Sequence, residues 1–78
     1  MEANNIYKTQ NLYEASFLMV KGFELVGKEK TLNKVMLLFK NDVEIQGGVL
    51  EFYNGEGKVS AKKLSDAYRS LKDFIFER

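Results

Sequence analysis

The chain has 78 residues, and its twelve Lys and Arg residues nearly balance its eleven Asp and Glu residues, which leaves a net charge of +1. It contains no Cys, His, Trp or Pro. These absences exclude disulfides, thiolate metal sites, iron–sulfur clusters and Ser-His-Asp chemistry, and the length allows a single small globular domain over residues 1–78.

The first half of the chain predicts a strand, a helix and a strand hairpin. Ile6 and Tyr7 give residues 6–9 the β-propensity of a short strand. Asn11 and Glu14 have the spacing of a helix capping box, which predicts a helix over 12–21 that ends at Gly22. Further strands are expected at 23–28 and 34–40. The apolar run over 35–39 indicates a central strand that is buried on both faces, with Leu37 and Phe39 at the centre of the core.

Two interpretations compete for residues 42–53. Asn41 and Glu44 repeat the capping spacing and predict a helix over this range. Gly47 and Gly48 oppose it, because a glycine inside a helix costs about 1 kcal/mol relative to alanine. A hairpin that turns at the two glycines fits the local pattern equally well. Ser60 then begins a last helix over 61–76, whose apolar residues recur at steps of three and four.

This order of elements predicts an α+β fold of the type β-α-β-β-α-α. A crossover through the first helix leaves the first and second strands parallel, and the third strand fits between them. We therefore expect a three-stranded mixed sheet of order 1-3-2 that is covered by helices.

Short motifs along residues 6–76 resemble a known family. They are Tyr7-x-Thr9-x-Asn11-Leu12, Lys21-Gly22-Phe23, the strand from Val35 to Phe39, Tyr53-x-Gly55 and Arg69-x-Leu71-Lys72. Together they resemble a family of short uncharacterised bacterial and mobile-element proteins, known as a domain of unknown function. Family members more often have Asp at the position of Asn11 and a plain helix at the glycine pair. The resemblance therefore favours the helix over 42–53, and it implies no activity.

The candidate partner-contact residues are aromatic: Tyr13, Phe17, Tyr53 and Phe76. The first helix is apolar on two sides, so Tyr13, Phe17 and Val20 form an exposed patch if that helix is outermost. The alternative is that the two later helices flank the first helix and bury the patch.

A second set of candidates is basic. Residues 58–78 carry six basic residues and three acids. The candidate nucleic-acid contacts are Lys58, Lys62, Lys63, Arg69 and Lys72. Asp66 and Asp73 interrupt this stripe, which favours a solvated face of mixed charge.

These observations favour a non-enzymatic binding module that docks on a protein partner or self-associates, such as a phage or mobile-element accessory protein or an inhibitor of a host system. A nucleic-acid-binding accessory domain and an oligomer that binds a small ligand are the alternatives. No catalytic residue, cofactor or metal is expected. We expect a cytoplasmic protein, because the N-terminus has no apolar stretch of signal-peptide length and the longest apolar run is far below the roughly 20 residues of a membrane span.

Overall fold

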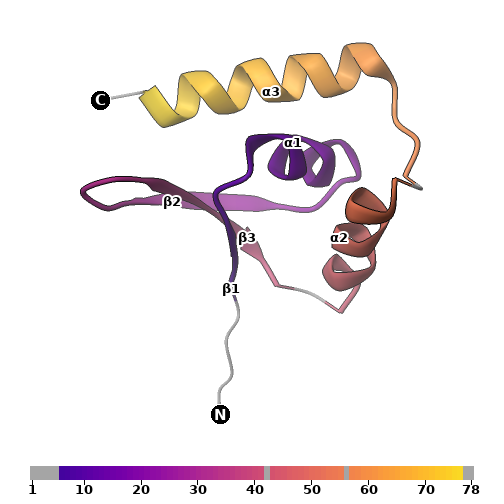
Figure 1. The fold of residues 1–78 in the computed structure, drawn as a ribbon, viewed down its shortest axis with the longest axis horizontal. Coiled ribbons are helices and arrows are strands. Elements are labelled where there is room, and N and C mark those ends of the chain that lie inside the picture. The colour runs from indigo at the N-terminus through magenta and orange to yellow at the C-terminus, as the bar shows by residue number, and fades with distance from the viewer. Residues whose placement is uncertain (1–5, 42, 56, 77–78) are drawn as a thin grey trace.

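The computed structural model describes residues 6–41, 43–55 and 57–76. The described residues follow the expected order β-α-β-β-α-α (Figure 1). The elements are β1 (Ile6–Thr9), α1 (Leu12–Val20), β2 (Leu25–Lys30), β3 (Val35–Lys40), α2 (Ile45–Asn54) and α3 (Ala61–Phe76). The α+β fold predicted from the sequence is confirmed.

The strands form one sheet of order β1-β3-β2, as predicted. β3 pairs antiparallel with both of its neighbours. β1 and β2 run parallel to each other, as the crossover through α1 requires, but they are not adjacent. The sheet is therefore antiparallel rather than mixed. The two strands that run parallel, β1 and β2, do not share hydrogen bonds.

The inner face of the sheet forms the centre of the core. Leu37 and Phe39 on β3 are fully buried, as expected for a central strand. In the register of the sheet, Thr9 and Lys28 flank Leu37, and this places them on the same face. Figure 1 shows α1 lying between this sheet and α3, so the sheet, α1 and α3 form three successive layers.

The outer face of the sheet is less covered than the sequence predicted. Met36 and Leu38 point outward from β3 and are only half-buried. Lys8 lies opposite Leu38 and Glu29 lies opposite Met36, and their 3.2 Å ion pair crosses β3. The expectation that both faces of β3 are buried is therefore wrong for the outer face, which the exposed Lys8–Glu29 ion pair crosses.

α1 begins as predicted and occupies the interior of the domain. The Asn11 side chain accepts hydrogen bonds from the backbone N–H groups of Tyr13 and Glu14, at 3.0 and 3.2 Å. Phe17 is only 4 % exposed and packs against Phe52 of α2, with 5.6 Å between ring centroids. Since α2 and α3 flank α1, Phe17 belongs to the core, and its assignment as a surface contact residue is wrong.

The segment with two glycines is a helix and not a hairpin. α2 starts at Ile45, three residues later than predicted, and its N-cap Glu44 makes no side-chain capping bond. Gly48 faces the core: a Cβ on it would lie 2.7 Å from a ring carbon of Phe23 and 3.3 Å from Leu18. The tight approach of these side chains explains why glycine is needed at this helical position.

α3 covers α1 and is fixed at both ends. Ser60 accepts a hydrogen bond from the Lys63 backbone N–H at 3.3 Å, which confirms the predicted start of the helix. At the other end, the Lys28 ammonium donates to the carbonyl oxygen of Phe74 and lies 4.6 Å from the centroid of the Phe74 ring. A cation at the C-terminus of a helix is electrostatically favourable, so Lys28 stabilises the contact between β2 and α3.

Candidate functional site

The predicted partner-contact aromatics do not form one surface. Tyr13 stacks on Tyr68 of α3, with ring centroids 4.9 Å apart and planes inclined by 14°. Tyr53 lies on α2, and Phe76 is the last residue of α3. All three of the predicted residues Tyr13, Tyr53 and Phe76 are exposed, but they mark three different places.

The predicted basic stripe is exposed and interrupted by acids. All five candidate side chains are on the surface: Lys58, Lys62, Lys63, Arg69 and Lys72. Lys62 pairs with Asp66 at 3.1 Å across one helical turn, and the Lys72 ammonium lies 5.8 Å from the Tyr68 ring centroid. Part of the positive charge is thus used within the domain, which weakens the case for phosphate binding.

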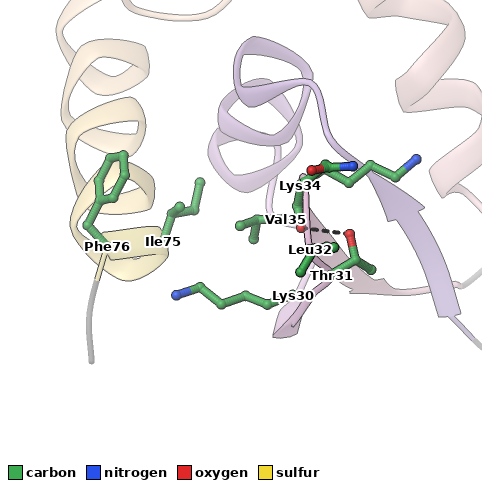
Figure 2. A pocket seen from close by; sticks show the side chains of 8 residues that line it. Lys30, Thr31, Leu32, Lys34, Val35, Ile75 and Phe76 are labelled. Carbon is green, nitrogen blue, oxygen red and sulfur yellow. Dashed lines mark hydrogen bonds between the residues drawn. The ribbon is translucent and has the colours of Figure 1, made fainter.

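An open hollow of about 350 Å³ lies between the β2–β3 turn and the end of α3 (Figure 2). Figure 2 shows Ile75 of α3 facing Val35 of β3 across the hollow, with Lys30 reaching toward α3. The hydroxyl of Thr31 is occupied by a 3.2 Å bond to the Lys34 carbonyl oxygen. Besides Thr31 and Asn33, the hollow is lined by apolar side chains and lysines, and this lining does not provide the convergent set of polar groups that fixes a small ligand.

A buried carboxylate connects the N-terminal half of the fold to α2. Glu14 on α1 is only 1 % exposed. Its oxygens accept hydrogen bonds from the hydroxyl groups of Tyr7 at 2.5 Å, Thr9 at 2.7 Å and Tyr53 at 3.0 Å. The three donors come from β1 and α2, so this Glu14 cluster joins three elements through one side chain.

The tyrosines of the Glu14 cluster are held in their neutral form. Burial raises the pKa of Tyr7, and the hydrogen bond to Glu14 raises it further. The hydrogen bond to Glu14 is also the main cause of the raised pKa of Tyr53. A tyrosinate could not donate to the carboxylate, so these hydrogen bonds favour the protonated hydroxyl groups of Tyr7 and Tyr53. Neither tyrosine is therefore activated as a nucleophile.

The capping-box spacing located the helix start but did not reveal the partners of Glu14. In a capping box its carboxylate would accept from the Asn11 backbone N–H, whereas that N–H donates to the Thr9 hydroxyl at 3.1 Å. A usable signal was present, because Tyr7, Thr9 and Tyr53 all belong to the motifs that resemble the family. Their shared contact with Glu14 was not visible in the spacing of any single motif.

The exposed face of α2 carries apolar side chains together with the polar residues Gln46 and Asn54. Leu50 is 61 % exposed and Tyr53 is 60 % exposed, and Val43 just before the helix is 97 % exposed. A Cβ on Gly47 would have no atom within 4 Å, in contrast to the crowded Gly48. Gly47 therefore weakens the helix, and no packing contact among the described residues requires a glycine there.

The two glycines also line a hollow beside α2. This open hollow of about 320 Å³ is lined by Lys21, Phe23, Glu44, Gly47, Gly48 and Glu51. Phe23 provides an apolar wall, and Lys21 pairs with Glu51 at 3.3 Å on the rim. We call Val43, Gly47, Leu50 and Tyr53, together with this hollow, the α2 surface.

Among the described residues, no helix has the length and apolarity needed to cross a membrane. The same part of the chain brings together no group of three or more acidic, His or Cys side chains that could hold a metal ion.

Comparisons with known proteins add one finding. The model of a family described as a domain of unknown function, DUF5659, matches residues 4–77. A search of curated proteins and a search of solved structures each found no significant match. The match covers nearly the whole folded chain and comes with no described activity.

Proposed function

We propose, from the premise that the chain belongs to the DUF5659 family of domains of unknown function, that it is a binding domain whose α2 surface docks on an α-helix of a protein partner. One observation carries the proposal: Gly47 reduces the stability of an exposed helix, and a Cβ on it would have no atom of the described residues within 4 Å, apart from its chain neighbours and its own helix backbone. A glycine on an exposed helix face allows the backbone of another element to come close. The partner would supply the contact that the domain itself lacks.

The neighbours of Gly47 support a docking role. Leu50 lies one turn away from Gly47, so their directions on the helix are close together. The hollow beside them has room for a side chain of the partner, with the ring of Phe23 as its apolar wall. An amphipathic helix commonly binds by placing apolar residues at three- and four-residue steps into such a surface.

A non-enzymatic role agrees with the chemistry available. The chain has neither Cys nor His, and its buried carboxylate Glu14 is occupied by three hydroxyl donors. Catalysis by the remaining residue types needs an enclosed pocket with convergent polar groups. The hollows described above are open to solvent and lie away from Glu14.

Site-specific photo-crosslinking tests the proposal. A photoreactive residue, p-benzoylphenylalanine, replaces Leu50 in the full chain, and the protein is irradiated in the cells that produce it. We expect one protein to be crosslinked from position 50 and not from Ser70, an exposed position on α3. The crosslinked protein is then purified and titrated by calorimetry against the unmodified chain.

The variant Gly47→Ala gives the decisive measurement. It is expected to fold at least as stably as the wild type and to bind the purified partner at least ten-fold more weakly. Ser70→Ala, which also adds a helix-favouring alanine to an exposed position, should leave the affinity unchanged. Equal binding by Gly47→Ala and the wild type would show that the α2 surface is not the contact.

A nucleic-acid-binding function is the second candidate, favoured by the exposure of the five basic side chains on residues 58–72. An electrophoretic shift assay at 50 and 200 mM salt distinguishes it, since phosphate contacts weaken steeply with salt. A shift that is lost in Lys62→Ala and at the higher salt would support nucleic-acid binding and contradict the main proposal.

A further inference from the structure

The turn between β2 and β3 presents an apolar side chain at its tip. The backbone N–H of Thr31 donates to the carbonyl oxygen of Lys34 at 2.9 Å, and the Thr31 hydroxyl donates to the same oxygen at 3.2 Å. These bonds close the turn and leave Leu32 at its tip, 99 % exposed. Single exposed leucines are common in proteins, so the surroundings of Leu32 decide whether it has a role.

More apolar surface lies beside Leu32. Ile75 and Phe76 of α3 line the same open hollow as Leu32, and Phe76 is 73 % exposed (Figure 2). Lys28 of β2 holds this end of α3 in place through its contacts with Phe74. The fold therefore brings two exposed apolar side chains from distant segments to one end of the molecule.

Positive charge borders these apolar side chains. Lys30 and Lys34 flank the turn and line the same hollow, and Figure 2 shows Lys30 reaching toward α3. Neither of their ammonium groups makes an ion pair with a described residue. We call this surface the hairpin end, and it consists of Lys30, Leu32, Lys34, Ile75 and Phe76.

The acids close to the hairpin end are balanced by bases. Glu29, the only acid within residues 28–35, pairs with Lys8 at 3.2 Å. In the sequence of α3 and the residues after it, Asp73 follows Lys72 and Glu77 precedes Arg78, so each of these pairs has no net charge. The hairpin end therefore keeps the positive charge of its two lysines.

We propose that the hairpin end rests on the surface of an anionic lipid bilayer, as a contact separate from the α2 surface. Leucine and phenylalanine side chains enter the boundary between head groups and acyl chains, and lysines beside them are attracted by anionic head groups. Figure 1 shows the β2–β3 hairpin and the C-terminal end of α3 at one end of the molecule and α2 at the other. A domain bound in this way keeps its α2 surface accessible to a protein partner.

Two other occupants match the hairpin end less well. A second copy of the chain, related by a two-fold axis, would bring four unpaired lysines together. A nucleic acid would neutralise the lysines, but the aliphatic side chain of Leu32 cannot stack on bases as an aromatic ring does. The lipid surface is the occupant that uses both the charge and the apolar tip.

Cosedimentation of the full chain with lipid vesicles tests the proposal. One set of vesicles is pure phosphatidylcholine, and the other contains about 30 mol % phosphatidylserine in addition. We expect the partition coefficient to be at least about ten-fold larger for the anionic vesicles, because each unpaired lysine contributes about five-fold, and to fall as the salt concentration rises. Equal binding to the two sets, or binding to neither, would overturn the proposal.

Matched lysine variants locate the contact. Lys34→Gln should lower the partition coefficient for anionic vesicles about five-fold. Lys58→Gln removes an exposed lysine from the connection between α2 and α3, away from the hairpin end, and should leave it unchanged. Equal losses in the two variants would mean that the attraction is not specific to the hairpin end. If Lys34→Gln weakens binding to a single-stranded oligonucleotide and not to vesicles, the lysines contact nucleic acid and the proposal is wrong.

A tryptophan reporter shows whether the apolar tip enters the bilayer. The chain has no Trp, so Leu32→Trp supplies a single fluorophore at the tip, and Val43→Trp supplies one at another fully exposed position. Both positions lack packing contacts, so circular dichroism should show folded proteins. Anionic vesicles should shift the emission of Leu32→Trp to shorter wavelength and leave that of Val43→Trp unchanged. Vesicle binding without a shift at position 32 would refute insertion of the tip.

Discussion

Replacing Glu14 by glutamine measures what the buried carboxylate contributes to the fold. The substitution keeps the shape of the side chain and removes its charge. Oε1 can continue to accept from Thr9 and Tyr53, and the new amide nitrogen takes the place of Oε2 beside the Tyr7 hydroxyl. The Tyr7 hydroxyl must then turn and accept a hydrogen bond instead of donating one.

The magnitude follows from these three bonds. A hydrogen bond to a charged group contributes about 1.5–3 kcal/mol and a neutral bond about 0.5–1.5 kcal/mol, so three exchanges lose about 3 kcal/mol. The glutamine is easier to bury than a carboxylate, which recovers part of this loss. We therefore expect Glu14→Gln to lower the free energy of unfolding by about 1–3 kcal/mol. Glu14→Ala, which leaves all three hydroxyls without their acceptor, should lower it by more.

Urea unfolding followed by far-ultraviolet circular dichroism measures these differences. A double-mutant cycle of Glu14→Gln with Tyr7→Phe should give a coupling of about 1–2 kcal/mol, because the two side chains share a hydrogen bond. The same cycle with Tyr68→Phe, on α3, should be additive within about 0.5 kcal/mol. A Glu14→Gln variant as stable as the wild type, with no coupling to Tyr7, would refute the stabilising role of the Glu14 cluster.

The remaining predictions concern stability. The pKa of Tyr7 is raised in the folded state by burial and by its bond to Glu14, so its contribution is fully present below about pH 10 and is lost as the pH rises further. Unfolding at alkaline pH should therefore depend less steeply on pH in Tyr7→Phe than in the wild type. Phe39→Ala removes a fully buried ring and should lower the free energy of unfolding by about 3–5 kcal/mol, which a circular-dichroism melt detects as the loss of the cooperative unfolding transition. Gly47→Ala should stabilise the domain by up to about 1 kcal/mol, whereas Gly48→Ala should destabilise it because its Cβ meets Phe23; equal effects in urea unfolding would contradict the difference in their surroundings.

The fold was predictable where a local pattern has one physical cause. The apolar run at 35–39 predicted the central position of β3 in the sheet, although only Leu37 and Phe39 within the run are fully buried. Ser60 and the regular apolar steps after it located α3 correctly. These features depend on burial and on capping by residues close in sequence.

The predictions failed where the cause lies between distant elements. Phe17 was a candidate surface residue if α1 was outermost, with a flanked α1 as the alternative, and the packing of Phe52 against Phe17 shows that α1 is interior. Asn41 and Glu44 had the spacing of a helix start, but Glu44 itself is the N-cap and its side chain does not cap the helix. Glu14 also had capping spacing, yet Tyr53, 39 residues away, is one of its partners.

The structure distinguishes the two glycines of α2, which look equivalent in the sequence. Both glycines weaken α2 to a similar extent, so from sequence alone they favoured a hairpin as much as a helix. In the fold, Gly48 is required by Phe23 and Leu18, whereas Gly47 has open space around it. A residue that weakens its own helix and fills no role in its own core points to a contact outside the domain. The exposed Leu50, one turn from Gly47, belongs to the same proposed docking surface.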